Sequence, residues 1–362
     1  MPDLTGKDGR MAAALTARFC SLADGSSIAF AERGEGSALV MVPGWVCQLE
    51  HNWSHPAAAS ALEKLSAARR FVWYDRLGCG MSDRDGFELS LDNDVEQLTA
   101  VLDAAGIRRT DLVGYSFGAP PAARFAARFP GRVNRLVLYS GFARGTAMMP
   151  RETLQASTQL IRADWDMALR MLASHMLPNA SSADLRWFAG FQQVAAEPET
   201  AARLLEHTWS MDVRSELADV TAPTLVVHNR DDQVIPASAG EELAAAIPGA
   251  RLHLLEGNEH DPFIRDSGAV VEAILDFVDG RPRTAATPPQ PPTPALTPRE
   301  QEVLTLVASG ATNEQIAASL GIAVKTVERH VTNVYRKVGA RGRADATRAA
   351  VALQLVPPTS IA

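Results

Sequence analysis

A serine, an aspartate and a histidine, far apart in the chain, have the types and order of a nucleophile, an acid and a base. Ser116 lies in Gly114-Tyr115-Ser116-Phe117-Gly118, between an apolar run and a helical pattern. A serine hydroxyl becomes a good nucleophile when a base takes its proton, and the base needs an acid to hold its tautomer. Two flanking glycines suit a tight strand-to-helix turn with no room for side chains. The pattern predicts nucleophilic attack on a carbonyl group.

The acid and the base are expected after two later apolar runs. Asp232 follows the run at 225–228, with Asp231 as the alternative acid, and His260 follows the run at 251–255. We therefore expect a catalytic triad of Ser116, Asp232 and His260, in the order Ser, acid, His. The remaining histidines are expected within strands, in loops, in a helical segment or near the carboxyl end: His51, His55, His175, His207, His228, His253 and His330.

Short apolar runs alternate with amphipathic stretches over the first 280 residues. The runs predict buried strands at 38–42, 71–74, 111–115, 135–139, 224–228 and 251–255. The amphipathic stretches at 60–70, 91–105 and 120–129 predict helices. Such alternation is typical of an α/β fold with a mostly parallel sheet and helices on both faces.

The segment at about 143–217 breaks this alternation and is helical throughout. It contains several methionine and tryptophan residues, namely Met148, Met149, Trp165, Met171, Trp187 and Trp209. Because it is inserted between two strands, we expect a helical cap over the sheet edge. Its large apolar side chains fit either plain core or an apolar ligand pocket.

Residues of about 20–280 resemble the α/β-hydrolase superfamily. Besides the serine motif, Pro43-Gly44-Trp45 takes the place of the family's His-Gly oxyanion loop, and 75–83 (DRLGCGMSD) is similar to its DxRGxGxSD turn. The resemblance implies that the backbone N–H groups of Trp45 and Phe117 form the oxyanion hole. It also assigns the acid to Asp232, the D of a D-x-V-x-P pattern. A serine nucleophile argues against an epoxide hydrolase or a haloalkane dehalogenase, which need a carboxylate there.

The clearest boundary lies at 281–294, RPRTAATPPQPPTP, with six prolines in fourteen residues. This composition excludes a helix or a sheet interior and predicts an extended linker. We therefore expect a sensor or catalytic domain at 1–280, a linker at 281–294 and a second domain at 295–362. The net charge is −7, but 295–362 carries eight Lys/Arg against five Asp/Glu, which leaves −10 on the rest.

The second domain has the start and stop signals of three short helices. Thr297-Pro298-Arg299-Glu300 and Thr312-Asn313-Glu314-Gln315 are capping boxes, and Gly310 and Gly321 end the first two helices. A third helix is expected at 324–338, with Val327, Val331, Val334 and Val338 toward the core. The short turn before it satisfies a helix-turn-helix.

This segment resembles the LuxR/GerE-type DNA-binding domain over about 60 residues, in LTPREQEVLTLVASGATNEQIAASLGIAVKTVERHVTNVYRKV. The resemblance implies a double-stranded DNA partner, phosphate contacts from the start of the third helix, base contacts from its middle and backbone contacts from its end. The residues are, in that order, Lys325 and Thr326; Glu328, Arg329 and Thr332; Arg336 and Lys337. It also implies a homodimer through a last helix at about 344–355. The alternative is a helical oligomerisation bundle that binds no DNA.

The composition sets further bounds. Charged residues interrupt every apolar stretch before about 18 residues, so no membrane span is expected. The first 24 residues make a poor signal peptide. Cys20, Cys47 and Cys79 have no disulfide or zinc spacing, so we expect no metal and no cofactor, and a cytoplasmic protein.

Together these features predict a transcription regulator whose α/β-hydrolase-like domain binds a small ester or acyl-type ligand, with hydrolysis left open. Two alternatives remain: a serine esterase whose tail only localises or dimerises it, and a catalytically inactive ligand receptor.

Overall fold

The computed structural model describes residues 16–264, 267–280 and 296–338, together with 340, 342–343, 346–347, 350 and 355–356. The side chains of 298, 336 and 338 are outside this description. Chain contacts divide the protein into two compact units, Met1–Pro282 and Arg283–Ala362. The proline-rich linker predicted at 281–294 and most of the helix predicted at 344–355 lie outside the described residues.

The first unit is built on an eight-stranded sheet with the order β1-β2-β4-β3-β5-β6-β7-β8. Strands β3 to β8 run parallel, and β1 and β2 are antiparallel additions at one edge. The strands are β1 (Arg18–Ser21), β2 (Ser27–Arg33), β3 (Ser37–Val42), β4 (Arg69–Tyr74), β5 (Thr110–Tyr115), β6 (Val133–Tyr139), β7 (Thr224–Asn229) and β8 (Arg251–Leu255). All six predicted strands are present, and the α/β class is confirmed.

The sequence did not predict β1 and β2. β1 is the outermost strand and is largely exposed, so it lacks the continuous apolar run of a buried strand. β2 lies between β1 and β4 and contains a short buried apolar run that the sequence analysis left unassigned. β1 leaves Phe19 and its neighbours exposed, whereas β2 buries Ile28 to Ala31. β2 joins the sheet through antiparallel pairing with β4.

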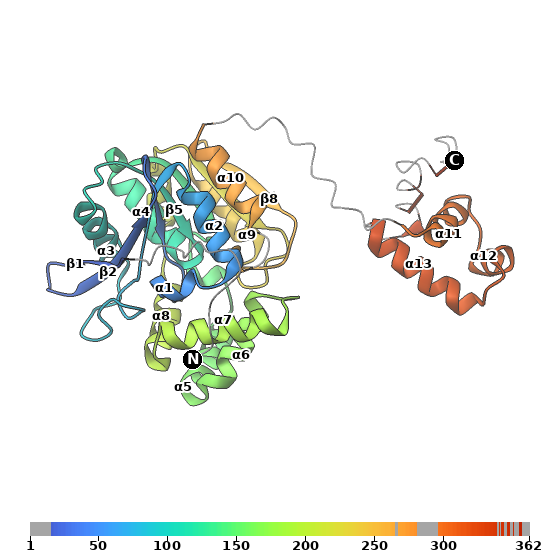
Figure 1. The fold of residues 1–362 in the computed structure, drawn as a ribbon, viewed down its shortest axis with the longest axis horizontal. Coiled ribbons are helices and arrows are strands. Elements are labelled where there is room, and N and C mark those ends of the chain that lie inside the picture. The colour runs from blue at the N-terminus through green and yellow to red at the C-terminus, as the bar shows by residue number, and fades with distance from the viewer. Residues whose placement is uncertain are drawn as a thin grey trace, which may run out of the picture. The chain divides into compact units, whose positions relative to one another are not determined.

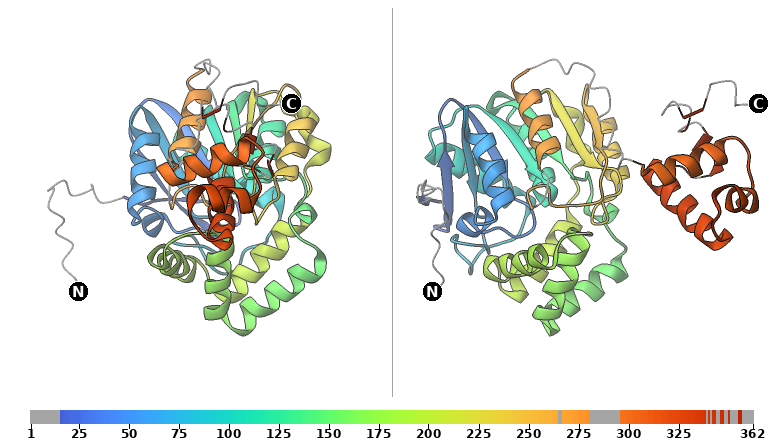
Figure 2. Two further views of the ribbon diagram at one scale, coloured as in Figure 1. Left: turned by 90° about the vertical axis from the view of Figure 1, so that its right-hand side faces the viewer. Right: turned by 45° about the vertical axis from the view of Figure 1, so that its right-hand side comes forward.

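Helices cover both faces of the sheet (Figures 1 and 2). The buried side chains of α1, α2 and α10 pack with one face, and those of α3, α4 and α9 pack with the other. These helices are α1 (Leu49–Asn52), α2 (Pro56–Ser66), α3 (Leu91–Ala104), α4 (Ala119–Arg128), α9 (Ala237–Ala246) and α10 (Gly268–Val278).

The helix predicted at 60–70 begins and ends four residues earlier than expected. The reason is Arg69, which opens β4 and is almost fully buried. Its guanidinium donates to Asp111 on β5 and to Asp279 after α10. A buried arginine between two carboxylates fits the start of an interior strand and not an exposed helix end.

Between β6 and β7 the chain forms four helices, α5 (Arg151–Ala163), α6 (Trp165–Met176), α7 (Ser182–Ala195) and α8 (Pro198–Ser210). Figure 1 shows them as a separate layer, in light green, below the sheet. Their buried side chains belong to the same core as the α3 and α4 face. No helix among the described residues is long and apolar enough to cross a membrane.

The second unit contains α11 (Pro298–Ala308), α12 (Asn313–Leu320) and α13 (Val324–Val338). Both capping boxes form, at Thr297 with Glu300 and at Thr312 with Gln315. Gly321 ends α12 with a φ of 65°, in the left-handed region that favours glycine. Val327 and Val334 are fully buried in a small core of their own. The helix-turn-helix predicted from the sequence is therefore present.

Candidate active site and recognition helix

Ser116 occupies a strained turn between β5 and α4. Its φ is 53°, which is rare for a residue with a side chain, and places the hydroxyl group at the end of the strand. An added Cβ at Gly114 would lie 2.7 Å from the Ala122 Cβ, and one at Gly118 would lie 2.4 Å from the Val42 carbonyl oxygen. Only glycine fits at either position, so the two glycines allow α4 to pack tightly under the serine.

The structure brings the three predicted triad residues together. The Ser116 Oγ lies 2.7 Å from His260 Nε2, and His260 Nδ1 lies 2.8 Å from Asp232 Oδ2. All three side chains are buried. The backbone N–H of His260 donates to the Met176 carbonyl at the end of α6, which ties the loop after β8 to the four-helix segment.

Asp232 is held in its ionised form. Its Oδ1 accepts hydrogen bonds from the N–H groups of Val234 and Ile235, at 2.9 and 3.1 Å. Burial by itself raises the pKa of this carboxyl, but the His260 imidazole and these hydrogen bonds outweigh it and bring the pKa below its ordinary value. An ionised Asp232 favours a proton on His260 Nδ1, which leaves Nε2 free to accept the serine proton.

The alternative acid, Asp231, does not lie in this arrangement. Its side chain is exposed, and its backbone N–H donates to the Gly257 carbonyl. A second histidine, His228 on β7, lies 3.7 Å from Asp232 Oδ2 and donates from Nε2 to the Ile235 carbonyl. The sequence placed His228 in a strand but gave no signal of its proximity to the triad.

The Pro43-Gly44-Trp45 loop borders the nucleophile. An added Cβ at Gly44 would lie 3.6 Å from the Ser116 Cβ, so the loop and the serine are in close contact. The Trp45 indole N–H donates to the Ala201 carbonyl on α8 at 3.0 Å. Arg76 Nη1 lies 3.4 Å from the Gly44 carbonyl oxygen. In a trans peptide this carbonyl and the Trp45 N–H point in opposite directions, so a donor on the carbonyl side fixes where the N–H points.

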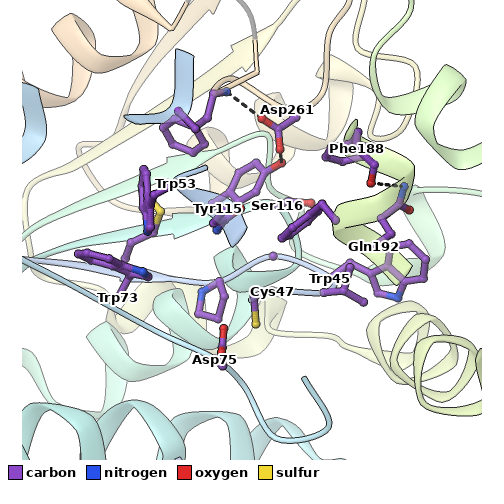
Figure 3. Close-up of a pocket in the computed structure, with 18 of the residues that line it drawn as sticks. Trp45, Cys47, Trp53, Trp73, Asp75, Tyr115, Ser116, Phe188, Gln192 and Asp261 are labelled. Atoms are coloured by element: carbon purple, nitrogen blue, oxygen red, sulfur yellow. Dashed lines mark hydrogen bonds between the residues drawn. The ribbon is translucent and has the colours of Figure 1, made fainter. Parts of the chain in front are cut away.

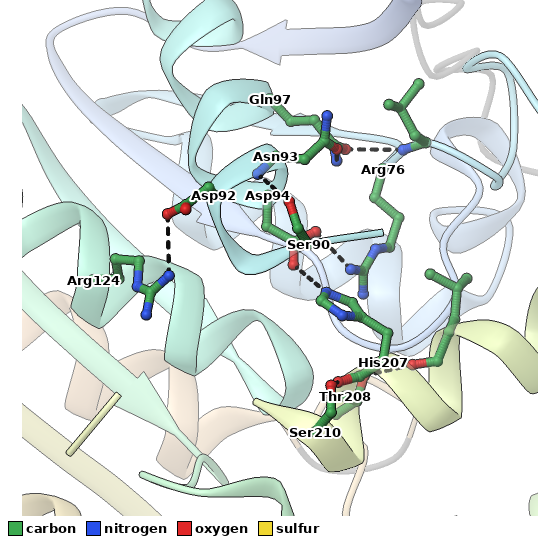
Figure 4. Close-up of polar contacts among 12 residues, drawn as sticks. Arg76, Ser90, Asp92, Asn93, Asp94, Gln97, Arg124, His207, Thr208 and Ser210 are labelled. Carbon is green, nitrogen blue, oxygen red and sulfur yellow. Dashed lines mark hydrogen bonds and ion pairs between the residues drawn. The ribbon is translucent and has the colours of Figure 1, made fainter. Parts of the chain in front are cut away.

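Arg76 itself is held by a buried cluster that the sequence did not predict (Figure 4). Its Nη2 lies 2.7 Å from Asp94 Oδ1 on α3, and Asp94 Oδ2 lies 2.8 Å from His207 Nε2 on α8. Burial raises the pKa of Asp94, but Arg76 and His207 outweigh this effect and lower it. The only signal in the sequence was the position of Arg76 in the DRLGCGMSD segment. The cluster therefore connects the Pro43-Gly44-Trp45 loop to α8.

A pocket opens at Ser116, and its wall is mainly apolar, with many aromatic side chains (Figure 3). Eight of its twenty lining residues are aromatic, and Met41 and Met176 add apolar surface. Residues 176, 188, 191 and 192 of the four-helix segment line it, but none of the six methionine and tryptophan residues singled out in the sequence does. Those six lie elsewhere in the segment, because the sequence pattern did not show which helix faces point to the serine.

On α13 the predicted DNA-contacting residues lie largely at the surface. The side chains of Lys325, Glu328, Arg329 and Thr332 are exposed, and Thr326 is half-buried. The Thr332 hydroxyl donates to the Glu328 carbonyl within the helix. Arg336 lies on the same helix, but its side chain is outside the described part of the structure.

Lys337 differs from the other predicted contacts. Its Nζ lies 2.6 Å from Glu300 Oε2, the same oxygen that accepts hydrogen bonds from Thr297 N and Oγ1. Lys337 thus links the end of α13 to the capping box of α11. This ion pair competes with the predicted contact of Lys337 to the DNA backbone, which stays a prediction.

Comparison with known proteins assigns both units. The model of the family described as alpha/beta hydrolase fold matches residues 37–267, and the model described as bacterial regulatory proteins, luxR family, matches residues 294–350. The chain is 30% identical to a 2-hydroxy-6-oxo-2,4-heptadienoate hydrolase of Pseudomonas putida, over 71% of this chain and 94% of that protein. It is 34% identical to a 2-hydroxymuconate semialdehyde hydrolase of Pseudomonas putida, over 59% of this chain and 78% of that protein.

Solved structures agree on the fold. An esterase from Exiguobacterium antarcticum superposes with a TM-score of 0.66 at 20% identity, covering 73% of this chain and all of that chain. A hydrolase from Pseudomonas aeruginosa superposes with a TM-score of 0.64 at 26% identity, covering 74% of this chain and 99% of that chain. The chain therefore belongs to the α/β-hydrolase superfamily and carries, joined to that fold, a DNA-binding domain of the LuxR family of bacterial regulators.

Proposed function

We propose that this protein is a transcription regulator whose hydrolase-fold unit binds and hydrolyses a small ester or acyl-type ligand. The observation that carries the proposal is the hydrogen-bonded Ser116, His260 and Asp232 arrangement in a chain that also has a LuxR-type helix-turn-helix. A pocket and a DNA-binding domain on one chain make sense when occupancy of the first biases the second.

The proposed chemistry follows the geometry of the triad. His260 Nε2 takes the Ser116 proton as the hydroxyl oxygen attacks the ligand carbonyl, and Asp232 stabilises the resulting imidazolium. The N–H groups of Trp45 and Phe117 are proposed to stabilise the oxyanion. His260 then returns the proton to the leaving alcohol, and a water molecule releases the acid from the acyl-serine by the same route.

The proposed DNA contacts come from α13. Lys325 and Thr326 bind phosphate, and Arg336 grips the DNA backbone. Glu328, Arg329 and Thr332 point into the major groove, where a bidentate arginine suits guanine. One short recognition helix reads few base pairs, so we propose a homodimer acting on chromosomal DNA in the cytoplasm.

One experiment tests the regulator as a whole. Fragments of genomic DNA bound by the full-length protein are selected and sequenced, and binding to the strongest site is measured against salt. We expect a shared sequence motif and a falling affinity with rising salt. Binding without salt dependence, with and without hydrolysable esters, contradicts the proposal.

A second candidate is a serine esterase whose tail only localises or dimerises it. The intact triad favours this candidate over an inactive receptor, because a receptor does not need all three residues in hydrogen-bonding distance. One outcome is that Ser116→Ala abolishes turnover of p-nitrophenyl esters but leaves transcription unchanged in cells that carry the variant. This outcome indicates a regulator that does not need the hydrolysis step. Turnover without any specific DNA site points to the esterase.

A further inference from the structure

The pocket extends to both sides of Ser116, and most of the side chains in its wall are apolar. The amide of Gln192, whose Oε1 has no partner among the described residues, lies on one of these sides. Figure 3 shows the serine between Trp53 and Trp73 on one side and Phe188 and Gln192 on the other. Trp53 and Trp73 pack edge to face at 5.1 Å between ring centroids, which makes a rigid wall. A ligand whose carbonyl sits at Ser116 therefore places an apolar group on each side of that carbonyl.

The ionisable groups in the wall are acidic. Asp75 is fully buried and its Oδ2 accepts hydrogen bonds from the N–H groups of Leu49 and Met81, while its Oδ1 has no partner among the described residues. Asp261 accepts a hydrogen bond from the Tyr115 hydroxyl at 3.2 Å. Both carboxyls line the pocket. A ligand that brings its own negative charge would meet these two groups.

The pKa values of these two carboxyls show that the pocket solvates an anion poorly. Burial raises the pKa of Asp75 to about 7, and burial raises the pKa of Asp261 as well. The wall therefore destabilises even its own carboxylates relative to water. A ligand carboxylate would suffer the same loss of hydration without compensation from a lysine or arginine, because none lines the pocket among the described residues. Arg76 is committed to Asp94.

From these contacts we propose that the pocket takes an uncharged ester or lactone with apolar groups on both sides of its carbonyl, and that it rejects carboxylate-bearing compounds. This inference rests on the proposed function, since it names the ligand class of the same site. It separates the chain from one of its relatives, because heptadienoate, in the printed name of that relative, denotes a carboxylate.

The test compares two esters that differ in charge. The methyl p-nitrophenyl diester of adipic acid and the free-acid mono-p-nitrophenyl ester have nearly the same shape. We expect kcat/KM of the purified full-length protein to be lower by about 100-fold for the free acid, because an unpaired charge enters an apolar site. A loss smaller than about tenfold overturns the inference.

A designed cation sharpens this test. Asn52 ends α1 and lines the pocket from a half-buried position, so a longer basic side chain there has access to water. Asn52→Arg should narrow the discrimination against the free acid by about tenfold, whereas the uncharged Asn52→Gln should retain the wild-type ratio. Thermal unfolding checks that each variant is folded. An unchanged ratio in folded Asn52→Arg overturns the electrostatic explanation.

A binding measurement distinguishes a failure of the proposed hydrolysis from a failure of the inferred ligand class. If no ester is turned over, the proposed hydrolysis fails, but ligand class is still measurable with Ser116→Ala by the shift in unfolding temperature on adding dimethyl or monomethyl adipate. Stabilisation by the diester alone supports the inference. Equal stabilisation by both compounds, or by the monoester alone, overturns it.

Discussion

The two units of this protein place their functional residues in different ways. In the hydrolase-fold unit, Ser116, Asp232 and His260 come from three loops after three different strands, and they meet only when the parallel sheet is complete. In the C-terminal unit, the proposed base-reading residues lie within two turns of one helix, at 328–332. A local site depends on the exposure of one helix face, whereas a dispersed site depends on the register of the whole sheet.

The largest expected effect tests the dispersed site. Asp232→Asn should lower kcat for an ester by about 10⁴-fold, because the amide holds the wrong histidine tautomer while keeping the shape. Asp231→Asn is the matched control, since Asp231 is exposed one residue away and outside the triad. Initial rates of p-nitrophenyl ester hydrolysis are the measurement. Equal losses in both variants would remove the distinction between the two aspartates.

The next effect tests the local site. Arg329→Ala should weaken binding to the selected DNA site by about 1–3 kcal/mol and relax specificity at one base position. Gln301→Ala, at an exposed position on α11, is the control. Fluorescence anisotropy with the selected site and with a scrambled duplex gives both affinities. A uniform loss on both duplexes would assign Arg329 to phosphate and not to a base.

A smaller effect tests how Arg76 supports the loop beside Ser116. Arg76→Lys keeps a positive charge for Asp94 but loses the forked guanidinium that also reaches the Gly44 carbonyl. We expect kcat to fall about ten- to a hundredfold with little change in KM, because the Trp45 N–H loses its fixed direction. Arg128→Lys, in a surface ion pair with Asp92, is the control. An unchanged kcat with a lower Tm would leave Arg76 with a structural role only.

The smallest effect concerns Lys337. Lys337→Met should destabilise the C-terminal unit by about 1 kcal/mol, as expected for a half-buried charge-assisted hydrogen bond, and leave the salt dependence of DNA binding unchanged. Thermal unfolding and anisotropy at several salt concentrations measure the two quantities. A salt slope smaller by about one, at constant Tm, would show that Lys337 contacts phosphate.

The ion pair of Lys337 with Glu300 also predicts how the stability of the C-terminal unit depends on pH. Lys337 and the Thr297 N–H lower the pKa of Glu300 to about 2. A carboxyl whose pKa is lowered on folding stabilises the fold above its unfolded pKa of about 4.3, and this contribution is lost as the pH falls toward about 2. Lys337→Met should reduce that acid sensitivity, and unfolding curves between these pH values measure it.

The sequence predicted the central sheet well because strands buried on both faces read as continuous apolar runs. It missed β1, the outermost strand, whose side chains are largely exposed, and β2, whose buried run of four apolar residues was left unassigned. It extended the α2 pattern to Arg70, because a helical pattern does not reveal that Arg69 pairs with two carboxylates in the folded sheet.

The candidate site was predicted in part. The order of Ser116, Asp232 and His260 was readable because each follows an apolar run, and the carboxyl ends of parallel strands share one edge of a sheet. The pocket wall was not readable, since Phe188, Phe191 and Gln192 face the serine through the packing of α7. The Arg76, Asp94 and His207 cluster joins three segments with no common pattern.

The sequence by itself determined the six central parallel strands, the strained turn at Ser116 and the capping boxes, because these depend on residues a few positions apart. Only the tertiary structure decided that Asp232 and not Asp231 reaches His260, and that Lys337 pairs with Glu300. The physical reason is distance. A hydrogen bond forms when donor and acceptor lie within about 3 Å of each other. Only the packed chain determines which of two adjacent carboxylates, or which distant side chain, comes within that distance.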